Sequence, residues 1–317
     1  MGEQRDHAWG DLEEATRTLV AALGPRVRVG FPIAPLTTFR IGGPAALFVE
    51  AEEDATLAVV AQAVAATGVP VAVIGKGSNL LVSDRGFPGI VVRLGRGYRW
   101  AARDGERLTA GGAMPLPALA GIALRHGLAG LEFGVAIPAT LGGAVTMNAG
   151  AHDRSMSEVV ERVDVFLLGD ATRRSITAAE AGFGYRRSDL PGGSIVVGAT
   201  VRLQPGEEPA IRRLMDEARE WRRRTQPLAE PNCGSVFTNP HGDHAARLIE
   251  AAGAKGLRIG GAHVSQKHAN FIVADRGASA TDVWALVQRV RDLVAADTGV
   301  RLDTEVRVIG DLTDGEG

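Results

Sequence analysis

The chain of 317 residues is poor in cysteine, in aromatic residues and in net charge. Cys233 is its only cysteine, so an internal disulfide is excluded and a reducing compartment, the cytoplasm, is expected. One cysteine and seven histidines without metal-ligand spacing also argue against a zinc site, so no metal is expected. A net charge of -2 gives no reason to expect nucleic acid or an anionic membrane as a partner.

A long uninterrupted apolar run is missing as well. The longest apolar stretch, residues 56–74, is broken by Gly68 and Pro70, which indicates a helix, a turn and a strand rather than a membrane span. The first twenty residues are charged and lack the apolar core of a secretory signal. With 45% hydrophobic residues, the chain is long enough for two or three globular domains.

Hydrophobic patterning predicts an α+β fold in three regions. In the middle region, a long loop over residues 129–157 is followed by several short strands. No helices separate these strands, which predicts an antiparallel sheet. The last region is expected to end in a strand, RLDTEVRVIG, that contains Glu305. The predicted helices cover residues 11–24, 54–67, 116–128, 207–224, 244–253 and 282–297. The predicted strands are 69–75, 89–94, 106–114, 161–169, 172–177, 194–203 and 269–275, and residues 37–50 are expected to form a loop followed by a further strand.

Three of these helices carry local signals. Asp54 is expected to cap the helix that ends before Gly68. The helix over residues 207–224 has one apolar face. That face consists of Ile211, Leu214, Met215, Ala218 and Trp221. The helix over residues 282–297 has a valine stripe and ends before Gly299; the stripe is formed by Val283, Val287, Val290 and Val294.

Two glycine-rich stretches could bind a ligand. VIGKGSNLLVSD, residues 73–84, follows a buried strand, and its backbone N–H groups could converge on a phosphate. It lacks the third glycine and the following helix of a dinucleotide fingerprint, so an ordinary turn is the stronger interpretation of this stretch alone. GVAIPATLGGAVTMNAGAH, residues 134–152, is apolar and poor in charge, as is typical of a backbone that approaches a flat ligand or of a buried connection. Together the two stretches favour a large cofactor.

Two further stretches hold candidate catalytic side chains. In FGYRRSDL, Arg186 could hold a carboxylate or stabilise an enolate, or could lie at a solvated strand end. In PNCGSVFTNP, Cys233 has no local base partner and is expected to be a small buried residue. By spacing alone, Ser235 is a turn serine. Glu305 is either solvent-facing or, if buried, an acid with a raised pKa.

A polar cluster lies in GLRIGGAHVSQKHANFIV. It places Ser265, Lys267 and His268 just before an apolar strand. Such a cluster suits a diphosphate or a sugar, and a polar β-turn is an equally good interpretation.

Seven stretches in order resemble one family, the UDP-N-acetylenolpyruvoylglucosamine reductases, also called UDP-N-acetylmuramate dehydrogenases. They extend from about residue 36 to residue 310. They are TTFRIGGPA, GKGSNLLVSDRGFPG, IPATLGGAVTMNAGA, GYRRS, CGSVFTNP, GLRIGGAHVSQKHANFIV and EVRVIG. The resemblance implies an FAD-binding fold of the p-cresol methylhydroxylase type with two α+β subdomains, plus a C-terminal α+β substrate-binding domain. It divides the chain into subdomain 1 (1–95, joined by 305–317), subdomain 2 (96–206) and the substrate domain (207–304).

The resemblance also implies the reaction. NADPH reduces non-covalently bound FAD, which then reduces UDP-N-acetylglucosamine enolpyruvate to UDP-N-acetylmuramate for peptidoglycan, and hence for cell-wall growth and division. Arg186 matches the arginine that stabilises the enolate-like state, Ser235 the serine that delivers the proton, and Glu305 the glutamate that polarises the site. The expected cofactor-binding residues are Gly75, Lys76, Gly77, Ser78, Asn79, Ile137, Pro138, Gly142, Gly143, Asn148, Ala149, Gly150 and Ala151. The expected substrate-binding residues are Tyr185, Gln226, Asn239, Lys267 and His268.

Three details complete the expectations. Residues 187–235 contain no tyrosine, so the chain resembles the form of the family without an inserted tyrosine-bearing loop over the substrate. A monomer or weak oligomer is expected. Competing hypotheses are a flavin-dependent hydroxy-acid or alcohol oxidase, against which the ordered motifs argue, and a non-catalytic nucleotide-sugar binder, which would be colourless.

Overall fold

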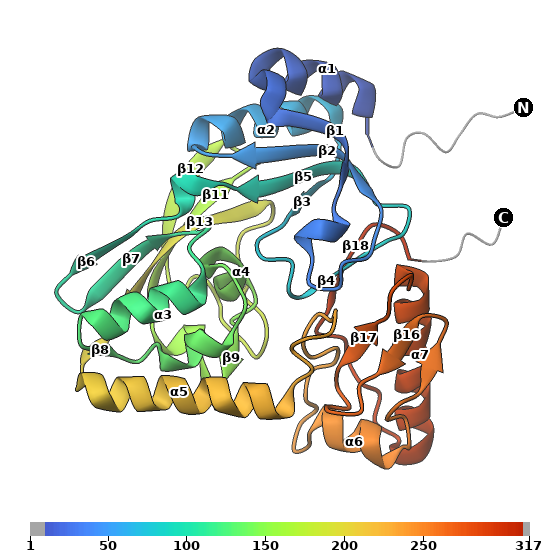
Figure 1. Cartoon of the computed structure of the whole chain (residues 1–317). Coiled ribbons are helices and arrows are strands. Elements are labelled where there is room, and N and C mark those ends of the chain that lie inside the picture. The colour runs from blue at the N-terminus through green and yellow to red at the C-terminus, as the bar shows by residue number, and fades with distance from the viewer. Residues whose placement is uncertain (1–9, 313–317) are drawn as a thin grey trace, which may run out of the picture. The chain divides into compact units, whose positions relative to one another are not determined.

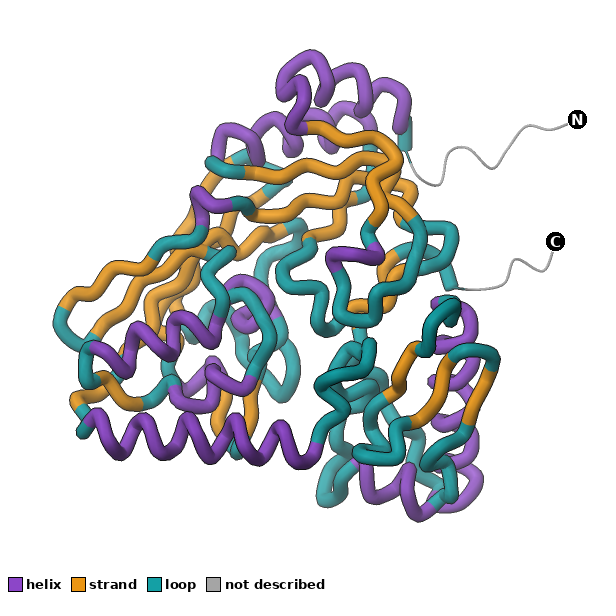
Figure 2. Tube along the Cα trace, in the orientation of Figure 1, coloured by secondary structure: helices purple, strands orange, loops and turns teal. Residues whose placement is uncertain are grey.

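The computed structural model describes residues 10–312, and its contacts divide the chain into two units. Unit 1 comprises residues up to 30, 46–76 and 88–221, and unit 2 comprises 31–45, 77–87 and 222 onward. The elements are labelled in Figure 1, and Figure 2 distinguishes helices from strands and loops along the same trace. Among residues 10–312, no helix is long and apolar enough to span a bilayer.

A four-stranded sheet with two helices forms the first part of unit 1. Its order is β1 (Val27–Pro32), β2 (Pro44–Ala51), β5 (Phe87–Leu94) and β3 (Val71–Val73), with β3 parallel to β5. Helices α1 (Leu12–Leu23) and α2 (Asp54–Thr67) lie together against this sheet (Figure 1). The sheet and both helices share one apolar core that includes Leu19, Leu57 and Ile90.

A five-stranded antiparallel sheet forms the second part of unit 1. Its order is β12 (Thr172–Thr177), β11 (Val160–Leu167), β13 (Ser194–Arg202), β7 (Arg107–Gly111) and β6 (Ala101–Asp104). Helices α3 (Leu116–Arg125) and α5 (Glu208–Thr225) contribute Leu119 and Met215 to the core of this part. The antiparallel arrangement predicted for the middle region is therefore confirmed.

The region predicted as one long loop, residues 129–157, contains regular elements instead. Helix α4 (Leu141–Thr146) begins after Thr140, whose side chain accepts a hydrogen bond from the Gly143 N–H at 3.3 Å. This helix escapes hydrophobic-pattern prediction because it has only 6 residues, two of them glycine. The other elements here are β8 (Leu128–Ala129), which pairs with β14 (Gln204–Pro205), β9 (Gly150–Ala151) and β10 (Arg154–Ser155).

Unit 2 combines a parallel strand pair with a small antiparallel sheet. Strand β18 (Arg307–Ile309) runs parallel to β4 (Leu80–Val82), and β15 (Arg258–Ile259), β16 (Ala262–Val264) and β17 (Ile272–Ala274) form the antiparallel sheet. Helices α6 (Ala245–Ala251) and α7 (Ala280–Thr298) pack on a core that contains the four stripe valines. Short 3₁₀ turns occur throughout the chain, at Gly24–Arg26, Ala34–Leu36, Arg96–Tyr98, Glu132–Ala136 and Met156–Glu158.

Leu214 and Trp221 are 47% and 41% exposed, so the buried face of α5 is narrower than its apolar face. Two local predictions are wrong. Glu53, not Asp54, occupies the N-cap position of α2 and makes no side-chain capping hydrogen bond, while Asp54, the first helical residue, accepts a hydrogen bond from the Tyr98 hydroxyl at 2.6 Å. Glu305 precedes β18 rather than lying in a strand. Strands β1, β4 and β6 were not predicted, because they are short or partly exposed.

Candidate active site

Ser235 lies in a loop of unit 2 that several hydrogen bonds hold in place. The preceding Gly234 has φ +80, a left-handed conformation that glycine adopts without strain, and its N–H donates to Asn232 Oδ1 at 2.9 Å. The next N–H, that of Val236, donates to the Asn270 carbonyl at 2.9 Å. Ser235 itself is half-buried at the surface of the unit 2 core. Its hydroxyl therefore extends from a backbone that hydrogen bonds fix on both sides.

Asn270 holds this segment from one side with its side chain. Its Oδ1 accepts the Phe237 N–H at 2.9 Å, and its Nδ2 donates to the Phe237 carbonyl at 2.8 Å. Asn270 is 4% exposed, so these bonds satisfy polar atoms that would otherwise be costly to bury. No motif in the sequence marks this residue. The available signal was an amide within the otherwise apolar ANFIV, which must find partners if it is buried.

Glu305 holds the same segment from the other side. Its N–H donates to the Val236 carbonyl at 2.8 Å, and its own carbonyl accepts Asn79 Nδ2 at 3.1 Å. The Asn79 carbonyl in turn accepts the Arg307 N–H at 3.0 Å. Unit 2 thus brings together Ser235, Glu305 and Asn79, which are far apart in the sequence.

Cys233, two residues before Ser235, is a packing residue. It is 2% exposed, and burial raises the pKa of its thiol above the usual range, with the nearby Glu305 carboxylate adding to the rise. The thiol is therefore neutral at physiological pH and is a poor nucleophile. This agrees with its expected role as a small buried side chain.

The polar cluster before β17 has a defined arrangement. His268 Nδ1 accepts the Asn270 N–H at 3.2 Å, which leaves the ring proton of the neutral imidazole on Nε2. Burial lowers the pKa of His268, so the neutral ring is favoured. The ring packs edge-on against Phe271, and Lys267 Nζ donates to the Arg223 carbonyl at 2.6 Å.

The other two predicted substrate residues of unit 2 lie beside helix ends. Asn239 Oδ1 accepts the N–H of Ala245, the first residue of α6, at 3.0 Å. Gln226 follows α5, and its Oε1 accepts Arg222 Nε at 2.9 Å. Both side chains therefore contribute to local structure, whatever else they bind.

In unit 1, Arg186 lies in a tight turn. Gly184 and Arg187 exchange backbone hydrogen bonds at 3.0 and 3.2 Å, and Arg186 between them has φ +56. A left-handed conformation is unusual for arginine and marks a site where the surroundings impose the backbone geometry. The guanidinium donates to the Gly150 carbonyl at 3.0 Å and lies 5.1 Å from the Tyr185 ring centroid.

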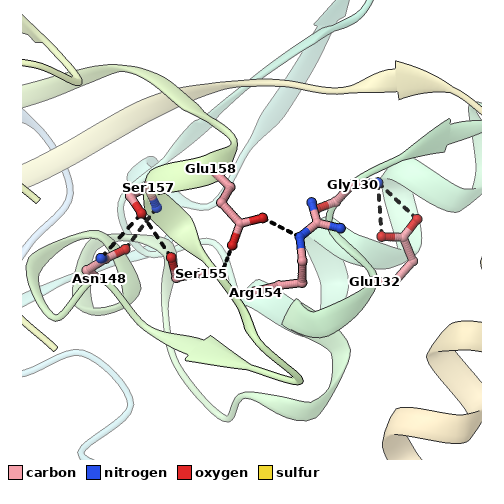
Figure 3. A network of polar contacts seen from close by, with 7 residues as sticks. All are labelled: Gly130, Glu132, Asn148, Arg154, Ser155, Ser157 and Glu158. Atoms are coloured by element: carbon pink, nitrogen blue, oxygen red, sulfur yellow. Dashed lines mark hydrogen bonds and ion pairs between the residues drawn. The ribbon is translucent and has the colours of Figure 1, made fainter. Parts of the chain in front are cut away.

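Two predicted FAD-binding stretches meet within unit 1. A Cβ on Gly75 would lie 2.5 Å from Thr140 Oγ1, so no side chain fits between these stretches. At Gly143, by contrast, an added Cβ would meet only Thr140 Oγ1 at 3.5 Å, and the residue is exposed. Small residues and exposed glycine backbone suit the close approach of a flat apolar ligand such as FAD. Asn148 instead directs its side chain toward Ser157 and Gly184 (Figure 3 shows Asn148 and Ser157).

Comparisons with known proteins agree with this geometry. Residues 226–309 match the family model described as "UDP-N-acetylenolpyruvoylglucosamine reductase, C-terminal domain", and residues 45–177 match "FAD binding domain". The UDP-N-acetylenolpyruvoylglucosamine reductase of Heliobacterium modesticaldum is 49% identical over 283 residues, which are 88% of this chain and 90% of that protein. The chain belongs to the UDP-N-acetylenolpyruvoylglucosamine reductase family. The resemblance inferred from the seven motifs is confirmed.

Other members of the family support the assignment over nearly the whole chain. A second reductase, from Symbiobacterium thermophilum, is 44% identical over 94% of this chain and 97% of that protein. The crystal structure of the reductase from Thermus caldophilus matches with a TM-score of 0.78 and 38% identity, covering 90% of this chain and all of that one. The predicted fold class, an FAD-binding fold with a C-terminal α+β domain, is confirmed.

Proposed function

We propose that this chain catalyses the NADPH-dependent, FAD-mediated reduction of UDP-N-acetylglucosamine enolpyruvate to UDP-N-acetylmuramate, a step of bacterial peptidoglycan precursor synthesis. The observation that carries this proposal is 49% identity to a reductase of this name over about nine-tenths of both chains. When bound, FAD supplies the redox chemistry by taking reducing equivalents from NADPH and passing them to the vinyl group of the substrate. The chain's own residues bind and orient the substrate and supply the proton.

Arg186 is the proposed electrostatic stabiliser. As the vinyl group is reduced, negative charge develops on the carbon next to the carboxylate, and a guanidinium can bind that carboxylate with two parallel hydrogen bonds. The turn between Gly184 and Arg187 fixes the backbone from which this side chain extends. A lysine in its place would keep the charge but lose the planar fork.

Ser235 is the proposed proton donor, and Glu305 is the proposed residue that polarises the site. A serine hydroxyl is a weak acid, so it needs the developing carbanion and an ordered field to give up its proton. The backbone bonds from Asn270 and Glu305 to Val236 support this role because they fix the chain next to Ser235.

The UDP-sugar is proposed to contact Tyr185, Gln226, Asn239, Lys267 and His268. A neutral His268 offers an Nε2 donor, and Lys267 offers an ammonium for the diphosphate. FAD is proposed to contact residues 75–79 and 137–151, as the exposed backbone of Gly143 supports. The three-way domain division at residues 95, 206 and 304 and a cytoplasmic location, which a single cysteine favours, belong to the same proposal.

Replacing Ser235 with alanine tests the proposed chemistry. In Ser235→Ala we expect NADPH to reduce the flavin at the wild-type rate in stopped-flow measurements. We expect steady-state turnover to fall by roughly 10²–10⁴, the usual contribution of general acid catalysis. Unchanged turnover would eliminate Ser235 as the proton donor. Cys233→Ala is the matched control two residues away, and it should turn over normally.

NADPH oxidation with and without UDP-N-acetylglucosamine enolpyruvate tests the function itself. A yellow protein that oxidises NADPH fast only when this substrate is present supports the reductase. Equal oxidation without it, accompanied by peroxide, would indicate an oxidase, and a colourless protein would indicate a nucleotide-sugar binder.

A further inference from the structure

Three residues of the glycine-rich loop hold the turn that carries Arg186. The Thr146 carbonyl accepts the Ser188 hydroxyl at 2.7 Å, Asn148 Nδ2 donates to the Gly184 carbonyl at 2.8 Å, and the Gly150 carbonyl accepts Arg186 Nη2 at 3.0 Å. The three contacts come from alternate residues, 146, 148 and 150, and reach both ends and the centre of the turn.

Asn148 is the only one of the three that acts through its side chain. It is 5% exposed, and its Oδ1 accepts the Ser157 N–H at 2.8 Å while its Nδ2 faces the Gly184 carbonyl and, at 3.4 Å, Ser157 Oγ. Figure 3 shows that Asn148 and Ser157 face one another, with Ser155 and Glu158 continuing the polar network. Because the amide is satisfied inside the protein, its role in holding protein backbone is complete without a ligand.

Asn148 also has φ +40, which asparagine and aspartate tolerate better than most residues. Its side chain therefore joins its own unusual backbone conformation to Gly184, at the start of the turn in which Arg186 has φ +56. Because this side chain holds the turn around Arg186 in one conformation, it restricts the directions in which the Arg186 guanidinium can point.

We propose that Asn148 is a positioning residue for Arg186, so that the loop expected to bind FAD also fixes the arginine that stabilises charge on the substrate. Its side chain is thus assigned to the arginine turn and not to the cofactor. The effect on turnover rests on the proposed function, whereas the effect on the turn does not.

Asn148→Asp is the sharpest variant. Aspartate keeps the shape, tolerates the backbone conformation and still accepts the Ser157 N–H, but it cannot donate to the Gly184 carbonyl and places a buried negative charge against it. We expect FAD content and flavin reduction by NADPH to stay at wild-type levels. We expect kcat/KM for UDP-N-acetylglucosamine enolpyruvate to fall roughly 10²-fold, as misplacing a catalytic group by about 1 Å can cause.

A double-mutant cycle with Arg186→Lys separates positioning from general damage. If Asn148 acts through the guanidinium fork, Asn148→Asp should cost less than about threefold in the Arg186→Lys background, because there is no fork left to misplace. Ser188→Ala, at a half-buried position beside the same turn, should change kcat/KM in the same direction by a smaller factor. Ser157→Ala keeps the Ser157 N–H donor and should match wild type.

Hydrogen–deuterium exchange of the peptide covering residues 183–190 provides a readout that needs no catalysis. We expect exchange in Asn148→Asp to be roughly fivefold faster there, the factor expected for loss of one hydrogen bond, and unchanged in the strands of the five-stranded sheet. Wild-type exchange and wild-type kcat/KM in this variant would overturn the proposal. So would additive effects in the cycle, or loss of FAD with normal substrate kinetics.

The two proposals fail in different ways. If wild-type protein does not turn over UDP-N-acetylglucosamine enolpyruvate, the proposed function is wrong, and exchange at residues 183–190 still decides whether Asn148 holds the turn. If wild type turns over and the variant matches it in both measurements, only the positioning role is wrong.

Discussion

At Cys233, burial has a measurable consequence for stability against pH. The thiol pKa is raised in the folded chain above its value of about 8.5 in the unfolded chain, so the folded chain holds this proton more tightly. Its contribution to stability is complete below the unfolded pKa and declines as pH rises above it. We expect the free energy of unfolding to fall with a slope approaching about 1.4 kcal/mol per pH unit above pH 9 from this group alone.

Cys233→Ala isolates that slope, because lysine and tyrosine residues titrate equally in both proteins. Urea unfolding at pH 8 and pH 10 should show a larger loss of stability in wild type than in Cys233→Ala. Identical pH slopes would mean that the thiol is not buried as described. In the same preparations, a thiol reagent should label wild type only after unfolding.

At the scale of elements, one amide joins the loop before β17 to the segment that carries Ser235. Asn270 pairs with both backbone groups of Phe237, as a neighbouring strand would. Asn270→Asp keeps the acceptor but loses the donor and buries a charge, so we expect it to destabilise the protein by about 1–3 kcal/mol. Chemical denaturation measures this loss, and turnover should fall further than flavin reduction by NADPH.

Gln288→Ala is a suitable comparison for this substitution. Gln288 is a half-buried amide on α7 whose Oε1 accepts Arg291 Nη1 at 3.3 Å, away from Ser235 in the chain. It should leave turnover unchanged. If Asn270→Asp lowers stability without changing turnover relative to flavin reduction, then Asn270 supports the fold but does not position Ser235.

For the whole molecule, prediction from the sequence succeeded where patterns are long and failed where contacts are distant. The valine stripe of α7 runs from Val283 to Val294, about three helical turns, so its buried face was predictable. Helix α4 was missed because six residues with two glycines give no periodic signal. The pairing of β18 with β4 joins residues more than 200 positions apart, which no local pattern reveals.

The candidate site shows the same division. Family motifs pointed to Ser235 and Glu305, but only the structure shows that Asn270 and Asn79 hold their backbones. The family resemblance implied that Asn148 binds the cofactor, and its partners, Ser157 and Gly184, could not be read from the sequence.

A ligand that binds only the folded chain stabilises it, so weaker FAD binding is measurable as a smaller gain in stability. Substitution of one glycine can therefore test where FAD contacts the chain. The fold itself explains most glycines of the expected FAD loops, since an added Cβ would lie 3.0 Å or less from another atom of the chain. These are Gly75, Gly77, Gly142 and Gly150. At Gly143 the nearest atom would be 3.5 Å away, an ordinary contact, so the protein alone does not require glycine there.

Gly143→Ala should therefore affect the two states oppositely. Without FAD, we expect the variant to be more stable by about 0.4–1 kcal/mol, because alanine restricts the unfolded chain and favours the helix. Wild type should gain roughly 2.7 kcal/mol when free FAD reaches a hundred times its Kd. If FAD lies against this backbone, the added methyl group should weaken binding at least about tenfold, which removes roughly 1.4 kcal/mol of that gain at the same FAD concentration. Thermal unfolding over a series of FAD concentrations measures both effects, and an unchanged FAD dependence would show that the cofactor does not approach Gly143.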